Sequence, residues 1–179
     1  MTSEGTTGTA TLETASGLST LRFERRLAHS PEKVWRAITD PAELTHWFPQ
    51  DLEGAFSPGA KLRFVFRGEP PVLNGETLYE FTGEVLEFDP PRVLAYTWAG
   101  DTLRWSLTPD GGGCLLVFTD TFAERGKAAR DGAGWHVCLE ALDALLDGTA
   151  GPAGSRWREQ YNRYAQAFGP EAASAPIPD

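Results

Sequence analysis

The sequence is poor in the residues that build disulfide frameworks, His/Cys metal sites and membrane helices. Among 179 residues there are two cysteines, three histidines and one methionine. Cys114 and Cys138 lie in separate predicted elements with no partner motif, so we expect buried free thiols, as is usual in a reducing cytosol. No stretch approaches the ~18 consecutive apolar residues that a membrane helix needs. These shortages exclude a disulfide-rich secreted fold and a helical membrane protein.

Positive charge is also scarce. The 16 basic residues are outnumbered by 25 acidic ones, which gives a formal net charge of −9. Because phosphate binding needs a clustered positive surface, this balance argues against a nucleic-acid partner. The densest basic group is Arg22, Arg25 and Arg26. A solvated strand edge explains these arginines, and a local anion site is the alternative.

The two ends of the chain have the composition of tails. Met1 to Gly17 is rich in Thr, Ser, Gly and Ala, and it has no basic region followed by an apolar run, so it does not resemble a signal peptide. We therefore expect a cytoplasmic protein. Residues 1–18 and 170–179 bury too little apolar area to become ordered. The sequence thus predicts flexible tails there, and one domain over 19–169.

Two helix starts follow each other closely near the N-terminus. Ser30 precedes Pro31, and Asp40 precedes Pro41. Serine and aspartate cap the first free backbone amides of a helix, and proline suits the first helical position. Since the apolar segment that begins at Leu21 reads as a strand, these motifs predict two short helices directly after strand 1.

Between Gly59 and Phe122 the hydrophobic pattern has a period of two, which is typical of half-buried strands. Turn signals separate the strands: the Asp89 to Pro91 segment, and the glycine run that follows Asp110. Because the connections are short, the pattern predicts an antiparallel meander.

The C-terminal part is helical. One continuous apolar stripe with helical spacing comprises Trp135, Cys138, Leu139, Leu142, Leu145 and Leu146, and Gly148 is a plausible stop. A further helix is predicted over 156–168, and its narrow aromatic stripe comprises Trp157, Tyr161, Tyr164 and Phe168. That stripe either packs on the domain's own surface or forms a homodimer contact.

These elements predict an α+β fold in which a curved antiparallel sheet of about six or seven strands grips the long C-terminal helix. The sheet must curl around the helix so that both apolar surfaces are buried. A curled sheet lined by aromatic residues can leave a cavity at its open end.

Several motifs, in this order, also occur in a known family. They are Ser30 to Pro41 (SPEKVWRAITDP), Leu44 to Phe48 (LTHWF), Gly83 to Arg92 (GEVLEFDPPR), Leu94 to Trp98 (LAYTW), Gly112 to Phe122 (GGCLLVFTDTF) and Gly134 to His136 (GWH). Together they cover residues 20–148, and the chain resembles the START-like (SRPBCC) superfamily. The closest resemblance is to the bacterial branch similar to the activator of the ninety-kilodalton heat-shock-protein ATPase. The resemblance implies a helix-grip fold with a cavity that binds a small hydrophobic molecule.

The candidate ligand-binding residues are inward-facing aromatic residues of the strands together with their neighbours on the helices. They are Trp47, Phe48, Phe64, Phe66, Phe81, Gly83, Trp98, Trp105, Phe118, Asp120, Trp135, Leu139 and Leu142. Most of the aromatic residues must also build the core. Gly83 either leaves room for a ligand or permits a bend in the sheet, and we favour the bend.

Two polar residues are candidates for catalysis. Asp120 shares the inward parity of Leu116 and Phe118, so it either enters the cavity or meets water where the strand frays. His136 lies beside the main helical stripe, where a surface or capping role is the plainer interpretation. No two histidines have metal-ligand spacing, and no nucleophile or phosphate-loop motif is present, so we expect no metal and no cofactor.

Three functions remain open. The first is a non-catalytic module that holds an apolar or amphipathic small molecule. The second is an enzyme, such as a cyclase, dehydratase or hydrolase, acting on a hydrophobic substrate. The third is an interaction module similar to the heat-shock-protein activator. Because a fold does not settle a role, the residues of the site must decide between them.

Overall fold

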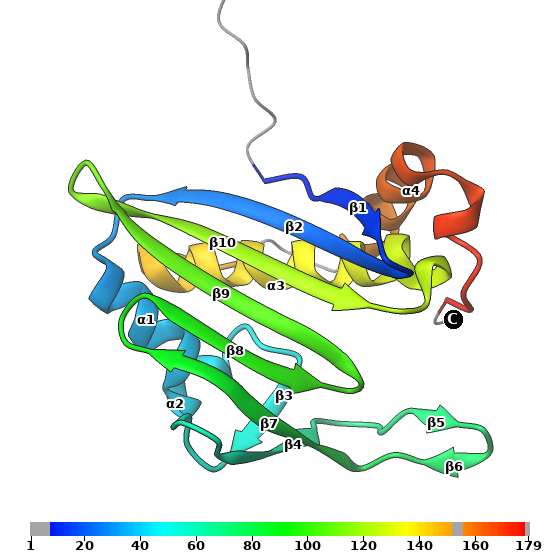
Figure 1. The fold of residues 1–179 in the computed structure, drawn as a ribbon, viewed down its shortest axis with the longest axis horizontal. Coiled ribbons are helices and arrows are strands. Elements are labelled where there is room, and N and C mark those ends of the chain that lie inside the picture. Colours follow the sequence, from blue (N-terminus) through cyan, green and yellow to red (C-terminus); the bar gives the residue numbers. More distant parts are fainter. Residues whose placement is uncertain (1–7, 152–155, 178–179) are drawn as a thin grey trace, which may run out of the picture.

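An eight-stranded antiparallel sheet curves around one long helix. The computed structural model describes residues 8–151 and 156–177. The strand order in the sheet is β1-β2-β10-β9-β8-β7-β4-β3. Figure 1 shows helix α3 running along one face of the sheet, and the two short helices contact the sheet at β9 (α1) and β3 (α2). The predicted α+β helix-grip architecture is confirmed, although the sheet has more strands than the six or seven expected.

The elements of the sheet and its short attached hairpin occupy most of the chain. The strands are β1 (Thr11–Ala15), β2 (Leu18–Leu27), β3 (Gln50–Glu53), β4 (Lys61–Phe66), β5 (Val72–Leu73), β6 (Glu76–Thr77), β7 (Glu80–Asp89), β8 (Val93–Trp98), β9 (Asp101–Asp110) and β10 (Gly113–Phe122). The helices are α1 (Pro31–Thr39), α2 (Pro41–Leu44), α3 (Ala128–Asp147) and α4 (Trp157–Phe168), with 3-10 turns at Arg125–Lys127 and Pro170–Ala172. Strands β5 and β6 pair only with each other and project from the sheet (Figure 1).

Strand β1 corrects the prediction of a flexible N-terminal tail. It pairs with β2 from Thr11↔Arg22 to Ala15↔Leu18. Ser16 and Gly17 form the turn with positive φ angles of 54° and 79°, as a tight hairpin requires. The prediction is therefore wrong for residues 11–18. This segment buries little apolar area, but its backbone hydrogen bonds to β2 hold it in an ordered hairpin. Residues 1–7 of the expected tail lie outside the described residues.

The C-terminal tail is also partly ordered. Ala172, in the turn after α4, is fully buried. The backbone N–H of Ala175 donates to the carbonyl oxygen of Gly126 at 3.0 Å. The prediction of a flexible segment from residue 170 is therefore wrong for residues 170–175, and residues 178–179 lie outside the described part.

The two short helices begin where their caps predict. The hydroxyl of Ser30 accepts from the N–H of Lys33 at 3.2 Å, and the carboxylate of Asp40 accepts from the N–H of Ala42 at 2.9 Å. Proline follows each cap, as expected. The helices follow the second strand rather than the first, because β1 precedes β2.

Helix α3 ends at Gly148, whose φ of 66° is left-handed, as predicted for a helix stop. Helix α4 then packs back on α3. Tyr164 is fully buried there, and a Cβ atom placed on Gly132 would lie 3.4 Å from its ring. The aromatic stripe of α4 therefore packs on the domain's own surface, and Tyr164 is not available for the alternative homodimer contact. Within the described ranges, no helix is both long and apolar enough to cross a bilayer.

Candidate functional site

The predicted ligand residues gather in one aromatic layer between the sheet and α3. The rings of Trp105 and Phe118 stack with centroids 4.0 Å apart, and Trp135 of α3 approaches Phe118 to 4.8 Å. Trp98 lies 5.1 Å from Trp135. Phe48 joins the same group at 5.8 Å from Trp135. The curled sheet and the helix therefore converge on side chains that the period-two pattern assigned to the inside.

One side of this layer is only partly covered. Phe66, Phe81 and Trp98 are half-buried, whereas Phe64, Trp105 and Phe118 are at most 1% exposed. The indole N–H of Trp98 donates to the side-chain oxygen of buried Gln50 at 3.0 Å. Strands β4, β7 and β8 thus form a partly exposed aromatic rim, which leads to Trp135.

Other predicted residues serve the core. Trp47 is buried, and its indole N–H donates to the carbonyl oxygen of Ala37 at 2.9 Å, which joins the turn after α2 to α1. Leu139 and Leu142 of α3 are fully buried. At Gly83 an added Cβ would lie 2.2 Å from the carbonyl oxygen of Thr97, so the close approach of β7 and β8 requires glycine.

Asp120 is the buried polar group of this interior. It has no exposed surface, and its Oδ2 atom accepts a hydrogen bond from the indole N–H of Trp135 at 2.9 Å. Among the residues that the structure describes, its Oδ1 atom has no hydrogen-bond partner. Burial, reinforced by the charge of Asp101, raises the pKa of Asp120 to about 8. The alternative of a frayed strand end is wrong, because β10 pairs with both of its neighbours beyond Asp120.

A charged cluster adjoins Asp120 at the end of the sheet. Asp101, Asp120 and Asp131 each offer one oxygen atom, and these atoms lie within 4.8 Å of one another. The ammonium group of Lys127 donates to Asp101 and lies 3.2 Å from Asp131. Carboxylates can hold a cation, and here Lys127 contacts two of the three. Sequence reasoning missed this cluster because its residues come from β9, β10 and the start of α3.

His136 lies apart from Asp120. It is 7% exposed, and its Nδ1 atom is 2.8 Å from the hydroxyl of Tyr164. That hydroxyl accepts from the backbone N–H of Ala10 at 3.0 Å, so its own proton is directed to Nδ1. The Nε2 atom then carries the histidine proton and faces Glu140 at 3.5 Å. The expected surface or capping role is wrong, because α4 covers the histidine.

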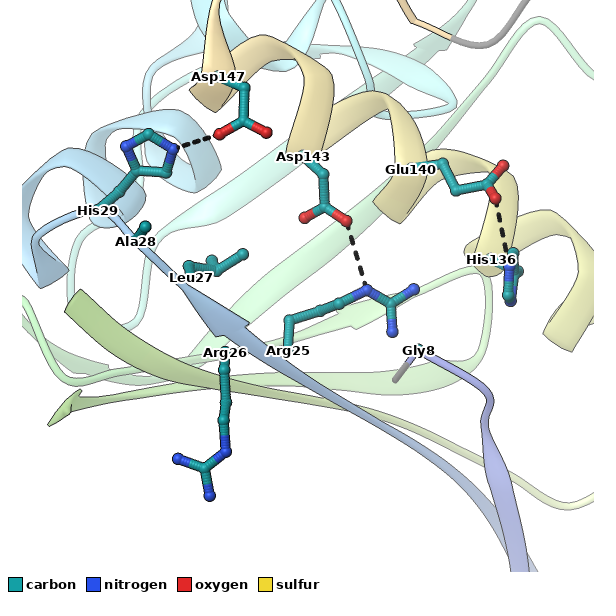
Figure 2. Close-up of a pocket in the computed structure, with 10 residues that line it drawn as sticks. All are labelled: Gly8, Arg25, Arg26, Leu27, Ala28, His29, His136, Glu140, Asp143 and Asp147. Carbon is teal, nitrogen blue, oxygen red and sulfur yellow. Dashed lines mark hydrogen bonds and ion pairs between the residues drawn. The ribbon is translucent and has the colours of Figure 1, made fainter. Parts of the chain in front are cut away.

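His136 also lines a pocket of about 410 Å³ between β2 and α3. Figure 2 shows Arg25 reaching from β2 toward Asp143 of α3, whereas Arg26 points away from the pocket. The Nε atom of Arg25 lies 3.5 Å from Asp143, and Arg25 is 6% exposed. The expectation of a solvated strand edge is therefore wrong for Arg25, because α3 lies over that part of β2. Burial lowers the pKa of His136, which keeps its ring neutral.

Solved structures of several bacterial proteins share this fold. A conserved protein of unknown function from Enterococcus faecalis is 24% identical with a TM-score of 0.74, and the match covers 89% of this chain and 90% of that one. A protein encoded by gene BPP1335 from Bordetella parapertussis is 27% identical, with a TM-score of 0.67 and coverage of 82% and 85%. CalU16 from Micromonospora echinospora is 19% identical, with a TM-score of 0.64 and coverage of 89% and 92%. None of the curated proteins matches the chain.

A protein-family model also matches the chain. It is described as "Activator of Hsp90 ATPase homolog 1-like protein", and it matches residues 28–147. The matched part runs from the end of β2 to the end of α3, so it contains the aromatic layer and Asp120. The chain therefore belongs to the family of Activator of Hsp90 ATPase homolog 1-like proteins, within the START-like superfamily.

Proposed function

We propose that this protein binds a small hydrophobic or amphipathic molecule between the sheet and α3. Three features support the proposal: the aromatic layer, its partly exposed rim at Phe66, Phe81 and Trp98, and the buried carboxyl group beyond it. Ligand sites are typically apolar surfaces with a few well-placed polar groups. A ligand would enter at the rim and pack against Trp98 and Trp135.

The observation that carries the proposal is the unpartnered Oδ1 atom of Asp120. Leaving a buried polar group without a partner costs about 1–3 kcal/mol. With a pKa of about 8 the carboxyl group is mostly protonated at pH 7, and a protonated carboxyl donates a hydrogen bond. A ligand with an acceptor oxygen, such as a carbonyl or carboxylate group, would supply the missing partner.

The test is a binding screen on the full chain. Lauric acid and 1,8-dihydroxyanthraquinone serve as probes, with native mass spectrometry and thermal unfolding as readouts. We expect one-to-one binding of at least one probe, a rise in Tm, and a loss of affinity of about tenfold or more in Trp98→Ala, which removes a buried aromatic contact.

The matched control is Trp35→Ala, because Trp35 packs on Phe88 at 5.7 Å, outside the aromatic layer. The control should bind the probes as the wild type does. If neither probe binds, or if both variants lose affinity equally, the proposal is wrong.

A further inference from the structure

Two buried polar side chains lie in one row across the inner face of the sheet. Asp120 of β10 pairs with Leu103 of β9, and Leu103 pairs with Tyr96 of β8. All three residues are at most 1% exposed. Paired residues point to the same face of a sheet, and neighbouring strands lie about 4.8 Å apart. Asp120 and Tyr96 therefore face the same interior, with their backbones about 10 Å apart.

The hydrogen bond of Asp120 fixes the position of its proton. Burial keeps this carboxyl group mostly protonated at pH 7. Oδ2 accepts from the indole N–H of Trp135 at 2.9 Å, so Oδ2 is the carbonyl oxygen of the acid. The proton then lies on Oδ1, which has no partner in the part of the chain that the structure describes. One O–H donor in the interior is thus without an acceptor.

Tyr96 supplies a second donor. Its hydroxyl oxygen accepts from the indole N–H of Trp105 at 3.3 Å. Burial raises the pKa of this phenol, so the hydroxyl keeps its proton. Within residues 8–151 and 156–177 no acceptor for that proton is found. The tyrosine ring stacks on Phe64 at 6.0 Å, which places it beside the aromatic layer.

The charges near Asp120 disfavour an anionic ligand. After burial, the negative charge of Asp101 does most to raise the pKa of Asp120; Asp131 adds to it, and Lys127 opposes it with a smaller effect. The ammonium of Lys127 is already shared between Asp101 and Asp131. A carboxylate placed next to Oδ1 would meet the same negative potential. The two donors therefore suit an acceptor that carries no charge.

We propose that the site between the sheet and α3 selects a neutral ligand with ketone or quinone oxygens, which accept from Oδ1–H of Asp120 and from the hydroxyl of Tyr96. This inference rests on the proposed binding function and narrows its ligand class. A site built to form a hydrogen bond with its ligand rejects an analogue that lacks the partner, because the buried polar group is then left unpaired.

The test compares three naphthalene probes of similar size on the full chain. They are 2-acetonaphthone, a ketone; 2-isopropylnaphthalene, which has a similar shape without an oxygen; and 2-naphthoate, an anion. Amide chemical-shift titrations measure the affinity of each probe and locate its site. We expect the ketone to bind about tenfold or more tightly than the other two, with shifts at Tyr96 and Asp120.

The outcomes separate this inference from the proposed function. Equal affinities for the ketone and the hydrocarbon, or a preference for 2-naphthoate, would overturn the selection of a neutral carbonyl and leave the binding function standing. Failure of all three probes to bind would overturn both.

The pH dependence of binding distinguishes a hydrogen bond from shape alone. Asp120 loses the Oδ1 proton as pH rises through its pKa of about 8, so the affinity for 2-acetonaphthone should fall by about tenfold between pH 7 and pH 9. The affinity for 2-isopropylnaphthalene should stay constant over that range. In Asp120→Asn the ketone affinity should not change with pH, because the amide keeps an N–H donor and does not titrate. A ketone affinity independent of pH in the wild type would contradict the assignment.

Tyr96→Phe removes the second donor and keeps the aromatic ring. This variant should bind 2-acetonaphthone about fivefold or more weakly, with the affinity for 2-isopropylnaphthalene unchanged. The control is Tyr161→Phe on α4, whose half-buried hydroxyl donates to the carbonyl oxygen of Ala173. Equal losses of ketone affinity in the two variants would contradict the role of Tyr96.

Discussion

Asp120 lies where the aromatic interior meets the charged end of the sheet. One of its oxygens accepts from Trp135, and Asp101 and Lys127 lie on its other side. An apolar replacement would leave the Trp135 indole N–H without its acceptor, whereas asparagine keeps an acceptor oxygen. The residue therefore combines a structural contact with a proton whose presence depends on pH.

We expect the stability of the fold to decrease with pH because of Asp120. The pKa is raised from 3.8 to about 8 on folding, so the protonated form is favoured in the native state. That contribution is complete below the unfolded pKa and is lost as pH rises through the folded pKa, at up to about 1.4 kcal/mol per pH unit. Urea unfolding at pH 5, 6, 7 and 8 measures this loss, which falls between the unfolded pKa of 3.8 and the folded pKa of about 8.

In Asp120→Asn the free energy of unfolding should depend less on pH, because the amide does not titrate. Asp110→Asn, which removes an exposed carboxylate near Arg26, should keep the wild-type slope. Equal slopes in the wild type and Asp120→Asn would show that Asp120 does not bind the proton.

At the scale of elements, close packing of two backbones requires glycine at particular positions. Strands β7 and β8 approach so closely at Gly83 that a side chain would meet the carbonyl of Thr97. The same pair of strands contains a register shift between Val85 and Glu87, where the sheet bends. The close approach of β7 and β8 therefore needs a residue without a Cβ atom at position 83.

Gly83→Ala should destabilise the fold by more than about 2 kcal/mol, because β7 and β8 would have to separate. Gly134→Ala is the matched control, since Gly134 lies within α3 and its nearest atom to a new Cβ is 4.0 Å away. Alanine favours the helix by roughly 0.5–1 kcal/mol over glycine, so the control should be neutral or stabilising. Denaturant unfolding of both variants checks the difference, and similar losses in both would contradict this account.

Local signals allowed most elements to be predicted, whereas contacts between distant residues did not appear in the sequence. Ser30, Asp40 and Gly148 mark helix ends by their own chemistry, and the structure has those ends. The inward position of Asp120 followed from strand parity. The partner of His136 is Tyr164, 28 residues later, and no local pattern indicates it. Strand β1 was missed because its order comes from hydrogen bonds to β2.

At the scale of the whole molecule, one hydroxyl joins three elements. Tyr164 of α4 donates to His136 of α3 and accepts from Ala10, next to β1. These groups are buried, so the segment before β1 is held to α3 and α4 at this residue. Helix α4 lies outside the family match, so this contact supplements the family's core.

Tyr164→Phe should lower the free energy of unfolding by about 2–3 kcal/mol, because His136 and the Ala10 N–H both lose a partner. Tyr161→Phe is the control, since the Tyr161 hydroxyl donates only at 3.3 Å to the carbonyl oxygen of Ala173 in a half-buried position. We expect Tyr161→Phe to lower the free energy of unfolding by less than about 1 kcal/mol. Thermal unfolding compares the two, and an equal effect would argue against the junction at Tyr164.

The contacts of Ala10 and His136 with the Tyr164 hydroxyl have a practical consequence for labelling. A bulky group attached to β1 or α4 would load elements that are held at the same buried hydroxyl. The β5–β6 hairpin is a better attachment point, because Val72 and Leu73 are more than half exposed and the hairpin pairs with no other strand. A reporter inserted there would leave the packing of the sheet against α3 undisturbed.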